Sequence, residues 1–271
     1  MHKVSLIISV YKDVESLAVI LDALKFQTYK DFEVVISEDG EFAGMKAFVE
    51  GLEHENKIVH LTQPDVGWRK NKALNSAIRQ SAGDYLIFID GDCVPHHRFV
   101  ENHLRFSSKG SIVAGRRVKL GPRYSRIFRK NIQHLPRLEK KVVFDFFGMR
   151  KDGAKFYEEG VYVNPETWVG KLLAKRKFRT IKGCNMSFFK GDIKLINGFD
   201  EDYTLPAIGE DVDLIWRCEA AGFSFRSVKN FAVQYHLHHR ENWTDNSHNE
   251  RIMRDKMREG QYVCKNGLIK Y

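Results

Sequence analysis

Residues 85–95 read YLIFIDGDCVP, and this stretch gives the strongest indication of the architecture of the chain. Its apolar run continues to Asp90 without polar alternation, which is typical of a strand buried on both faces of a sheet. Two aspartates, Asp90 and Asp92, then flank Gly91. In open parallel sheets ligands bind beyond the carboxyl ends of the strands. We therefore expect chemistry at Asp90-Gly91-Asp92.

Upstream of this stretch, strand and helix patterns alternate from the first residues onward. In the first helical segment, Leu17, Ile20, Leu21 and Leu24 recur at helical spacing. The order β-α-β-α-β-α-β predicts an α/β fold with a parallel sheet covered on both faces. The expected strands are Val4–Val10, Phe32–Ser37, Ile58–Leu61 and Tyr85–Asp90; the expected helices are Val14–Phe26, Ala43–Glu53 and Lys70–Gln80, with another beginning at Pro95.

Downstream, residues 116–182 hold 19 Lys and Arg against 6 Asp and Glu in a chain of net charge +9. Two interpretations stay open: a solvated, weakly ordered basic insertion, or a contact with phosphates of lipid, acceptor or nucleic acid. After it, regular patterns resume. They predict a strand at Gly183–Phe189, a helix from Gly209 to Ala221 ended by Gly222, a strand at Ala232–Tyr235 and a terminal helix at Asn249–Tyr262.

The chain of 271 residues suits one α/β unit with an appended region. No apolar stretch is long enough to span a bilayer, and Val4–Val10 is too short and too β-branched for a signal peptide. The four cysteines are widely spaced and form no CxxC pair. Reduced thiols and a cytoplasmic location are the simplest interpretation.

Asp90 and Asp92 are candidate ligands for a hard cation left open toward ligand oxygens. The alternative is a surface turn, because Asp-Gly is a common turn dipeptide. His236 follows the strand at Ala232–Tyr235 and is the candidate third ligand, with His238 as the alternative. Two carboxylates and an imidazole suit Mn²⁺ better than Mg²⁺.

Asp211 is the candidate general base, with Glu210 holding the acceptor. A helix N-terminus favours an ionised carboxylate, which can then accept a proton from an attacking hydroxyl. Simple N-capping is the alternative. At the start of another helix, Arg69 and Lys70 could meet a pyrophosphate, or form only an exposed basic helix start. Asp39 could accept a hydrogen bond from a pyrimidine N–H.

Together, these segments resemble the family 2 glycosyltransferases of GT-A fold. The resemblance rests on Ser9-Val10-Tyr11, Glu38-Asp39-Gly40, GWRKNKALN at 67–75, YLIFIDGDCVP and GEDVDL. GEDVDLIWRCEAAGF and QYHLHH are also similar to the galactosyltransferase-type segment of bacterial chondroitin polymerase and β4-galactosyltransferases. The resemblance covers residues 3–115 and 183–240.

The resemblance implies a GT-A fold: a Rossmann-like, mostly parallel sheet flanked by helices, with a basic insertion and a C-terminal helix. Residues 1–115 would bind the nucleotide sugar, 116–182 would form the basic insertion or acceptor region, and 183–271 would complete the acceptor and catalytic half. It places Asp39 at the base, Asp90 and Asp92 at the diphosphate–Mn²⁺ site, His236 on the metal and Asp211 as base. The expected donor-binding residues are Ser9, Tyr11, Asp39, Arg69, Lys70, Asn75 and Asp90.

Two departures limit what carries over. Ala207-Ile208-Gly209 replaces the Trp-Gly-Gly of the galactosyltransferases, so donor and acceptor preference do not transfer. The basic region 116–182 has no matching counterpart.

The expected activity is inverting, metal-dependent transfer of a sugar from a nucleotide diphosphate, UDP in the first instance, with Mn²⁺ (or Mg²⁺) as cofactor. The acceptor would be a hydroxyl of a glycan or lipid-linked glycan in surface polysaccharide or lipopolysaccharide synthesis. The location would be cytoplasmic, with peripheral contact to an anionic membrane surface at the inner face of the cytoplasmic membrane.

Three rival functions are weighed against this one. A nucleic-acid-binding protein fits the basic charge, but the acidic clusters would repel phosphates. A sugar-1-phosphate nucleotidyltransferase needs a Gly-rich loop that Tyr11-Lys12-Asp13 does not provide. A glycan-binding pseudoenzyme would not need all of these acids.

Overall fold

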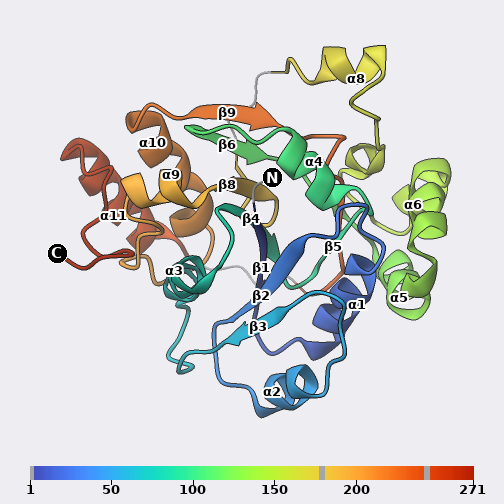
Figure 1. Cartoon of the computed structure of the whole chain (residues 1–271), viewed down its shortest axis with the longest axis horizontal. Helices are drawn as coiled ribbons and strands as arrows, with labels where there is room; N and C mark the ends of the chain where they lie inside the picture. The colour runs from blue at the N-terminus through green and yellow to red at the C-terminus, as the bar shows by residue number, and fades with distance from the viewer. Residues whose placement is uncertain (1–2, 177–180, 241–244) are drawn as a thin grey trace.

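The computed structural model describes residues 3–176, 181–240 and 245–271. Its main sheet has seven strands in the order β3-β2-β1-β4-β8-β6-β9 (Figure 1). β1 to β4 are parallel, β8 runs antiparallel to both β4 and β6, and β6 is parallel to β9. The mostly parallel sheet flanked by helices, expected from the sequence, is confirmed. The strands are β1 Val4–Val10, β2 Phe32–Glu38, β3 Ile58–Leu61, β4 Tyr85–Asp90, β6 Ser111–Ala114, β8 Met186–Phe189 and β9 Ser224–Ser227.

The continuous apolar runs of the central strands fill two cores, one on each face of the sheet. Along β1, Leu6 and Ile8 join one cluster and Ile7 the other, as the alternation of a strand requires. All three are fully buried, and each such side chain contributes roughly 1.5–3 kcal/mol of transfer free energy. The first core is packed by α1 (Val14–Leu24) and α2 (Ala43–Glu50), the second by α3 (Lys70–Gln80), α9 (Lys190–Leu195) and α10 (Asp213–Ala220).

A second, three-stranded sheet has the order β5-β10-β7 and draws together distant parts of the chain. Its strands are β5 Cys93–Pro95, β7 Val118–Lys119 and β10 Gln234–His236. The helix expected to begin at Pro95 is therefore wrong: α4 spans Phe99–Arg105. Residues 93–95 are extended because β10 pairs with them, a partner that local sequence does not reveal.

The basic stretch is folded over its described part, so the weakly ordered alternative is wrong there; residues 177–180 lie outside the described residues. Its helices are amphipathic, and Phe128, Leu135 and Val142 are buried against the first core. In Figure 1, α5 and α6 lie at one side of the molecule and α8 at its outer edge. The segments are α5 Pro122–Asn131, η1 Ile132–His134, α6 Leu135–Phe144, α7 Phe146–Lys151, η2 Tyr157–Gly160 and α8 Trp168–Leu173.

The C-terminal part follows the sequence-based expectation with changed boundaries. The helix expected from Gly209 begins as a π-helical turn, η3 (Ile208–Val212), and continues as α10. Gly222 ends it at φ 80°, a left-handed conformation that glycine adopts readily. The terminal helix α11 spans Ser247–Arg258. Among the residues described, no helix combines the length and apolar character needed to cross a bilayer.

Candidate functional site

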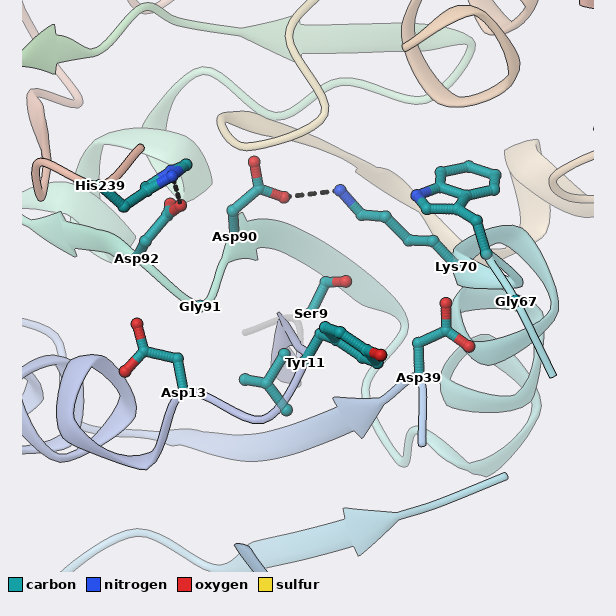
Figure 2. A pocket seen from close by; sticks show the side chains of 12 residues that line it. Ser9, Tyr11, Asp13, Asp39, Gly67, Lys70, Asp90, Gly91, Asp92 and His239 are labelled. Carbon is teal, nitrogen blue, oxygen red and sulfur yellow. Dashed lines mark hydrogen bonds and ion pairs between the residues drawn. The ribbon is translucent and has the colours of Figure 1, made fainter. Parts of the chain in front are cut away.

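A pocket of about 580 Å³ opens at the carboxyl ends of β1, β2 and β4. Register explains its position: Ser9 pairs with Asp90 and Val10 with Glu38, so the three strands end at one edge of the sheet. Figure 2 shows His239 and Asp92 at one end of the pocket and Asp39 at the other, with Asp90 and Lys70 between. The lining residues are Ser9, Val10, Tyr11, Asp13, Asp39, Gly67, Trp68, Lys70, Asp90, Gly91, Asp92 and His239.

Gly91 allows the ends of β1 and β4 to approach closely. A Cβ at this position would lie 2.9 Å from the Ser9 carbonyl oxygen and 2.8 Å from a Val10 methyl, and the Gly91 N–H donates to the Ser9 carbonyl at 2.7 Å. Any larger residue would push the strand ends apart. The spacing of Asp90 and Asp92 therefore depends on this glycine.

Asp90 is held between two cations. Its Oδ1 accepts from Lys70 Nζ at 2.7 Å, and its Oδ2 lies 3.3 Å from Arg117 Nη1. Lys70 also contacts Glu210 Oε2 at 2.5 Å. Burial alone would lower the pKa of Lys70, but attraction by Asp90 and Glu210 outweighs it and raises that pKa well above its ordinary value. Lys70 is thus a permanent cation inside the pocket.

Asp92, His236 and His239 form a cluster suited to a divalent ion. Asp92 Oδ2 lies 3.3 Å from His236 Nε2 and 3.1 Å from His239 Nε2, and the two Nε2 atoms are 3.3 Å apart. Ligands at about 2.1 Å from an ion in octahedral geometry lie about 3 Å from one another, so these separations fit. A carboxylate and two imidazoles on one side leave further positions open, and this donor set suits Mn²⁺. The chain therefore provides a fitting set of ligands.

This cluster differs from the expected set in two ways. His236 meets Asp92 as expected, because β10 pairs with β5 and the Leu237 N–H donates to the Asp92 carbonyl at 2.8 Å. Asp90 lies outside the cluster, beside Lys70 and Arg117. His239 completes the cluster, although it was not among the ligands expected from the sequence.

At the other end of the pocket, Asp39 is oriented by two donors. Its Oδ1 accepts from Gln63 Nε2 at 2.7 Å and its Oδ2 from the Arg69 backbone N–H at 2.8 Å. Tyr11 extends beside it with 56% of its surface exposed, and Ser9 lines the pocket on the side toward Asp90 (Figure 2). A fixed carboxylate and an exposed ring next to each other can bind a flat, hydrogen-bonding ring.

Arg69 and Asn75 lie elsewhere than the sequence suggested. The Arg69 guanidinium donates to the Trp68 carbonyl, and only its backbone N–H serves the pocket through Asp39. Asn75 is fully buried, where its amide donates to the Phe199 carbonyl and to Glu201. Neither side chain lines the pocket.

Glu210 and Asp211 lie on the π-helical turn η3, where Glu210 contacts Lys70. Asp211 Oδ1 accepts from the Gly183 backbone N–H, and its Oδ2 lies 3.6 Å from Lys182 Nζ. The helix dipole was expected to keep Asp211 ionised, but burial acts the other way and raises its pKa, although Lys182 and Gly183 lower it. Burial likewise raises the pKa of Glu210 to about 7, with Lys70 opposing and Asp90 and Asp211 adding to the rise. Both are poised nearer neutral pH than ordinary carboxyls.

The third acid of this segment, Asp213, is structural. It is fully buried, lies 3.1 Å from Arg217, and accepts from the Tyr203 hydroxyl at 2.8 Å. Of these three acids, Glu210 and Asp211 therefore belong to the candidate site, whereas Asp213 belongs to the core.

A mostly parallel α/β sheet with acids, histidines and a lysine at its carboxyl edge is the architecture of a glycosyltransferase of GT-A fold. Residues 5–167 match the profile of Glycosyl transferase family 2, and residues 168–240 match one described as the N-terminal domain of galactosyltransferase. The first match covers more than half of the chain, which therefore belongs to the family 2 glycosyltransferases.

Curated relatives agree with this assignment. The chain is 26% identical to the chondroitin synthase of Escherichia coli over 92% of its own length and 37% of that protein. It is 23% identical to the hyaluronan synthase of Pasteurella multocida over 94% of its length and 27% of that protein. The chain thus spans well under half the length of these two relatives.

Solved structures of similar fold are also glycosyltransferases. A mannosyltransferase from Pyrobaculum calidifontis, in complex with GDP-Man and Mn²⁺, superposes with a TM-score of 0.57 at 15% identity, covering 95% of this chain and 62% of that one. TarS of S. aureus gives 0.58 at 13% identity, covering 94% and 39%. At these identities the likeness confirms the fold alone.

Proposed function

We propose that this glycosyltransferase transfers a sugar from a nucleotide diphosphate to an acceptor hydroxyl, with a divalent metal and with inversion at the anomeric carbon. The observation that carries the proposal is the Asp92–His236–His239 cluster at one end of the pocket, opposite Asp39. A nucleotide diphosphate has the same arrangement, with a flat base at one end and a charged diphosphate at the other.

The base of the donor would lie at Asp39, whose carboxylate has lone pairs left for a pyrimidine N–H. Tyr11 would stack on it, with Ser9 below and Trp68 on the pocket wall. A uracil N3–H matches an acceptor carboxylate, which favours UDP as the nucleotide. The ribose would pass Asp90.

The metal, Mn²⁺ or Mg²⁺, would be held by Asp92, His236 and His239, and when bound it stabilises the negative charge of a diphosphate leaving group. Lys70 supports the same charge with a fixed cation near Asp90. The two imidazoles favour Mn²⁺, since Mg²⁺ prefers oxygen ligands.

Asp211 would serve as general base in a single in-line displacement. The acceptor oxygen attacks the anomeric carbon, the bond to the diphosphate oxygen breaks, and the acceptor proton passes to Asp211. Gly183 and Lys182 orient its carboxylate. Glu210, paired with Lys70, would hold the acceptor. Attack opposite the leaving group inverts the anomeric configuration.

The acceptor would be a glycan or lipid-linked glycan of a surface polysaccharide or lipopolysaccharide. Support comes from the relatives, which are named as synthases of chondroitin and hyaluronan. We divide the chain accordingly into a donor half (1–115), an acceptor region (116–182) and a half that completes the catalytic site (183–271). The family 2 assignment favours this function over nucleic-acid binding and over nucleotidyl transfer.

Isothermal titration of UDP and GDP tests the donor and metal assignments together. UDP is expected to bind in Mn²⁺ and to lose most of its affinity in EDTA, because the diphosphate would lack its counter-charge. GDP should bind more weakly, since guanine is larger than uracil. If neither nucleotide binds with metal present, the proposed function is wrong.

We also propose that the enzyme works in the cytoplasm, on the inner face of the cytoplasmic membrane. Phe144 and Phe147, at the junction of α6 and α7, are 84% and 89% exposed, with Lys140, Lys141 and Lys151 close in sequence. Exposed aromatics with neighbouring lysines suit an anionic lipid surface, at about 1 kcal/mol per cation.

Vesicle sedimentation checks this location. The protein is expected to sediment with vesicles containing anionic phosphatidylglycerol at low salt, and to be released by high salt. Phe144→Ser with Phe147→Ser should reduce binding, whereas Tyr271→Ser, a change at another exposed aromatic, should not. Absence of binding at low salt rules out the membrane proposal.

A further inference from the structure

A buried thiol lies directly behind the proposed metal ligands. Cys93 is fully buried, and its Sγ–H donates to Asp92 Oδ1 at 3.1 Å. The other oxygen of the same carboxylate, Oδ2, lies 3.3 Å from His236 Nε2 and 3.1 Å from His239 Nε2. The two oxygens of Asp92 therefore have different partners: one accepts from the protein interior, and the other is turned toward the position of the ion.

The pairing of β5 with β10 explains why the thiol lies there. Cys93 is the first residue of β5 and stands opposite His236 of β10. Residues directly opposite in an antiparallel pair point to the same face of the sheet, with their Cβ atoms about 4.5–5.5 Å apart. The strand pairing that brings His236 to Asp92 thus brings Cys93 to the same carboxylate.

The surroundings of the sulfur leave Asp92 as the acceptor of its proton. Arg117 Nη1, which also lies 3.3 Å from Asp90 Oδ2, points at the sulfur from 3.9 Å. A guanidinium has only donors, so the sulfur can only accept from it. The sulfur of Cys184, also buried, lies within 4.8 Å. A carboxylate accepts hydrogen bonds better than a thiol sulfur does, so the proton of Cys93 is directed to Asp92 rather than to Cys184.

We propose that Cys93 is a positioning residue for metal binding: its thiol holds the Asp92 carboxylate in the orientation that presents Oδ2 to the divalent ion. The proposal rests on the proposed function, because it takes Asp92 as a metal ligand. Groups that hydrogen-bond to a metal ligand keep it oriented before the ion arrives, and their loss lowers metal affinity roughly 10- to 100-fold. A thiol is a weak donor, so the lower end of this range is expected for Cys93.

The test compares Cys93→Ala with Cys93→Ser. Mn²⁺ is titrated into the full chain, with and without UDP, and the electron paramagnetic resonance of the free ion is followed. The two new side chains differ only by a hydroxyl, which can donate to Asp92 in place of the thiol. Mn²⁺ affinity is expected to fall about tenfold in Cys93→Ala and to remain close to the wild-type value in Cys93→Ser. At saturating Mn²⁺, UDP affinity should equal that of the wild type in both, because no residue that lines the donor pocket is changed.

Cys264→Ala is the matched control. Cys264 is equally buried, and its thiol donates to the Asn197 carbonyl at 3.4 Å, in the C-terminal part of the chain. Its loss also removes a buried hydrogen bond and leaves a small cavity, so thermal unfolding should show a loss of stability in both alanine variants. Only Cys93→Ala should lose Mn²⁺ affinity, since a thiol with a purely structural role changes stability alone.

Each result supports or overturns the positioning role. Equal losses of Mn²⁺ affinity in Cys93→Ala and Cys93→Ser would assign the effect to packing of the sulfur and overturn it. Wild-type affinity in Cys93→Ala would mean that Asp92 is oriented without the thiol, and would overturn it as well. So would a loss in Cys264→Ala as large as that in Cys93→Ala. Absence of Mn²⁺ binding in the wild type, with and without UDP, would instead refute the metal site of the proposed function.

Discussion

Asp211→Asn is expected to abolish sugar transfer while leaving Mn²⁺-dependent UDP binding unchanged. The substitution keeps the size and shape of the side chain, and an amide oxygen can still accept the Gly183 N–H. It removes only the ability to take a proton from the acceptor, a contribution of roughly 10²–10⁴-fold to the rate. Initial rates with saturating donor and acceptor, beside UDP titration of the same preparation, would measure both effects.

The acid side of the pH–rate profile provides a second readout for the same residue. Burial raises the pKa of Asp211, so the active carboxylate is lost, and the rate falls, at a higher pH than for an exposed aspartate near 4. Glu210→Gln is the matched control, since it removes the neighbouring carboxyl of pKa about 7 and leaves Asp211 as base. It should weaken acceptor use and keep measurable transfer. Near-normal turnover by Asp211→Asn would refute the assignment of the base.

The first half of the fold could be predicted from the sequence because its signals are local. The apolar run that ends at Asp90 is a buried strand. The helical patterns between the strands predict that the strands are parallel. Strand ends in a parallel sheet meet at one edge, so Asp39, Lys70 and Asp92 could be placed together from the sequence alone. No hairpin is expected among the first four strands. Few sheet topologies were therefore possible for them.

The second half of the fold could not be predicted in the same way, because it depends on pairings between distant segments. β10 lies between β5 and β7, and this arrangement brings His236 to Asp92 and the segment of Arg117 to Asp90. His238 was the alternative ligand because three histidines follow this strand within four residues. β10 ends at His236, however, and the chain then turns so that His239 meets Asp92.

Asn75 shows a different limit of sequence reasoning. It lies in a motif segment with Lys70, but five residues along a helix change the face that a side chain occupies. Its amide instead accepts the Phe199 N–H at 2.9 Å and donates to the Phe199 carbonyl, which fixes the loop before η3 against α3. A motif residue can thus support the site from the core without touching the ligand.

Asp92→Ala is expected to remove both metal-dependent nucleotide binding and turnover. Asp92 is the carboxylate of the ligand cluster, and its ionised form is favoured: burial alone would raise its pKa, but hydrogen bonds from His236 and His239 lower it well below the ordinary value. Without it, two imidazoles remain as metal ligands. Mn²⁺ affinity should fall roughly 100-fold or more, beyond the range seen for residues that only support a ligand. Titration of Mn²⁺ followed by UDP would measure the loss.

His239→Ala and His238→Ala form the matched pair that tests the geometry of this cluster. The two histidines are adjacent and both exposed, but only His239 Nε2 lies 3.1 Å from Asp92, whereas the His238 backbone N–H donates to Ser125. Mn²⁺ affinity should therefore fall in His239→Ala and stay at the wild-type level in His238→Ala. The reverse result would place the metal on the other histidine and would mean that the chain after β10 rearranges when the ion binds. Equal affinities in both variants and the wild type would remove the metal from this end of the pocket, and with it the reason for orienting the donor diphosphate toward Asp92.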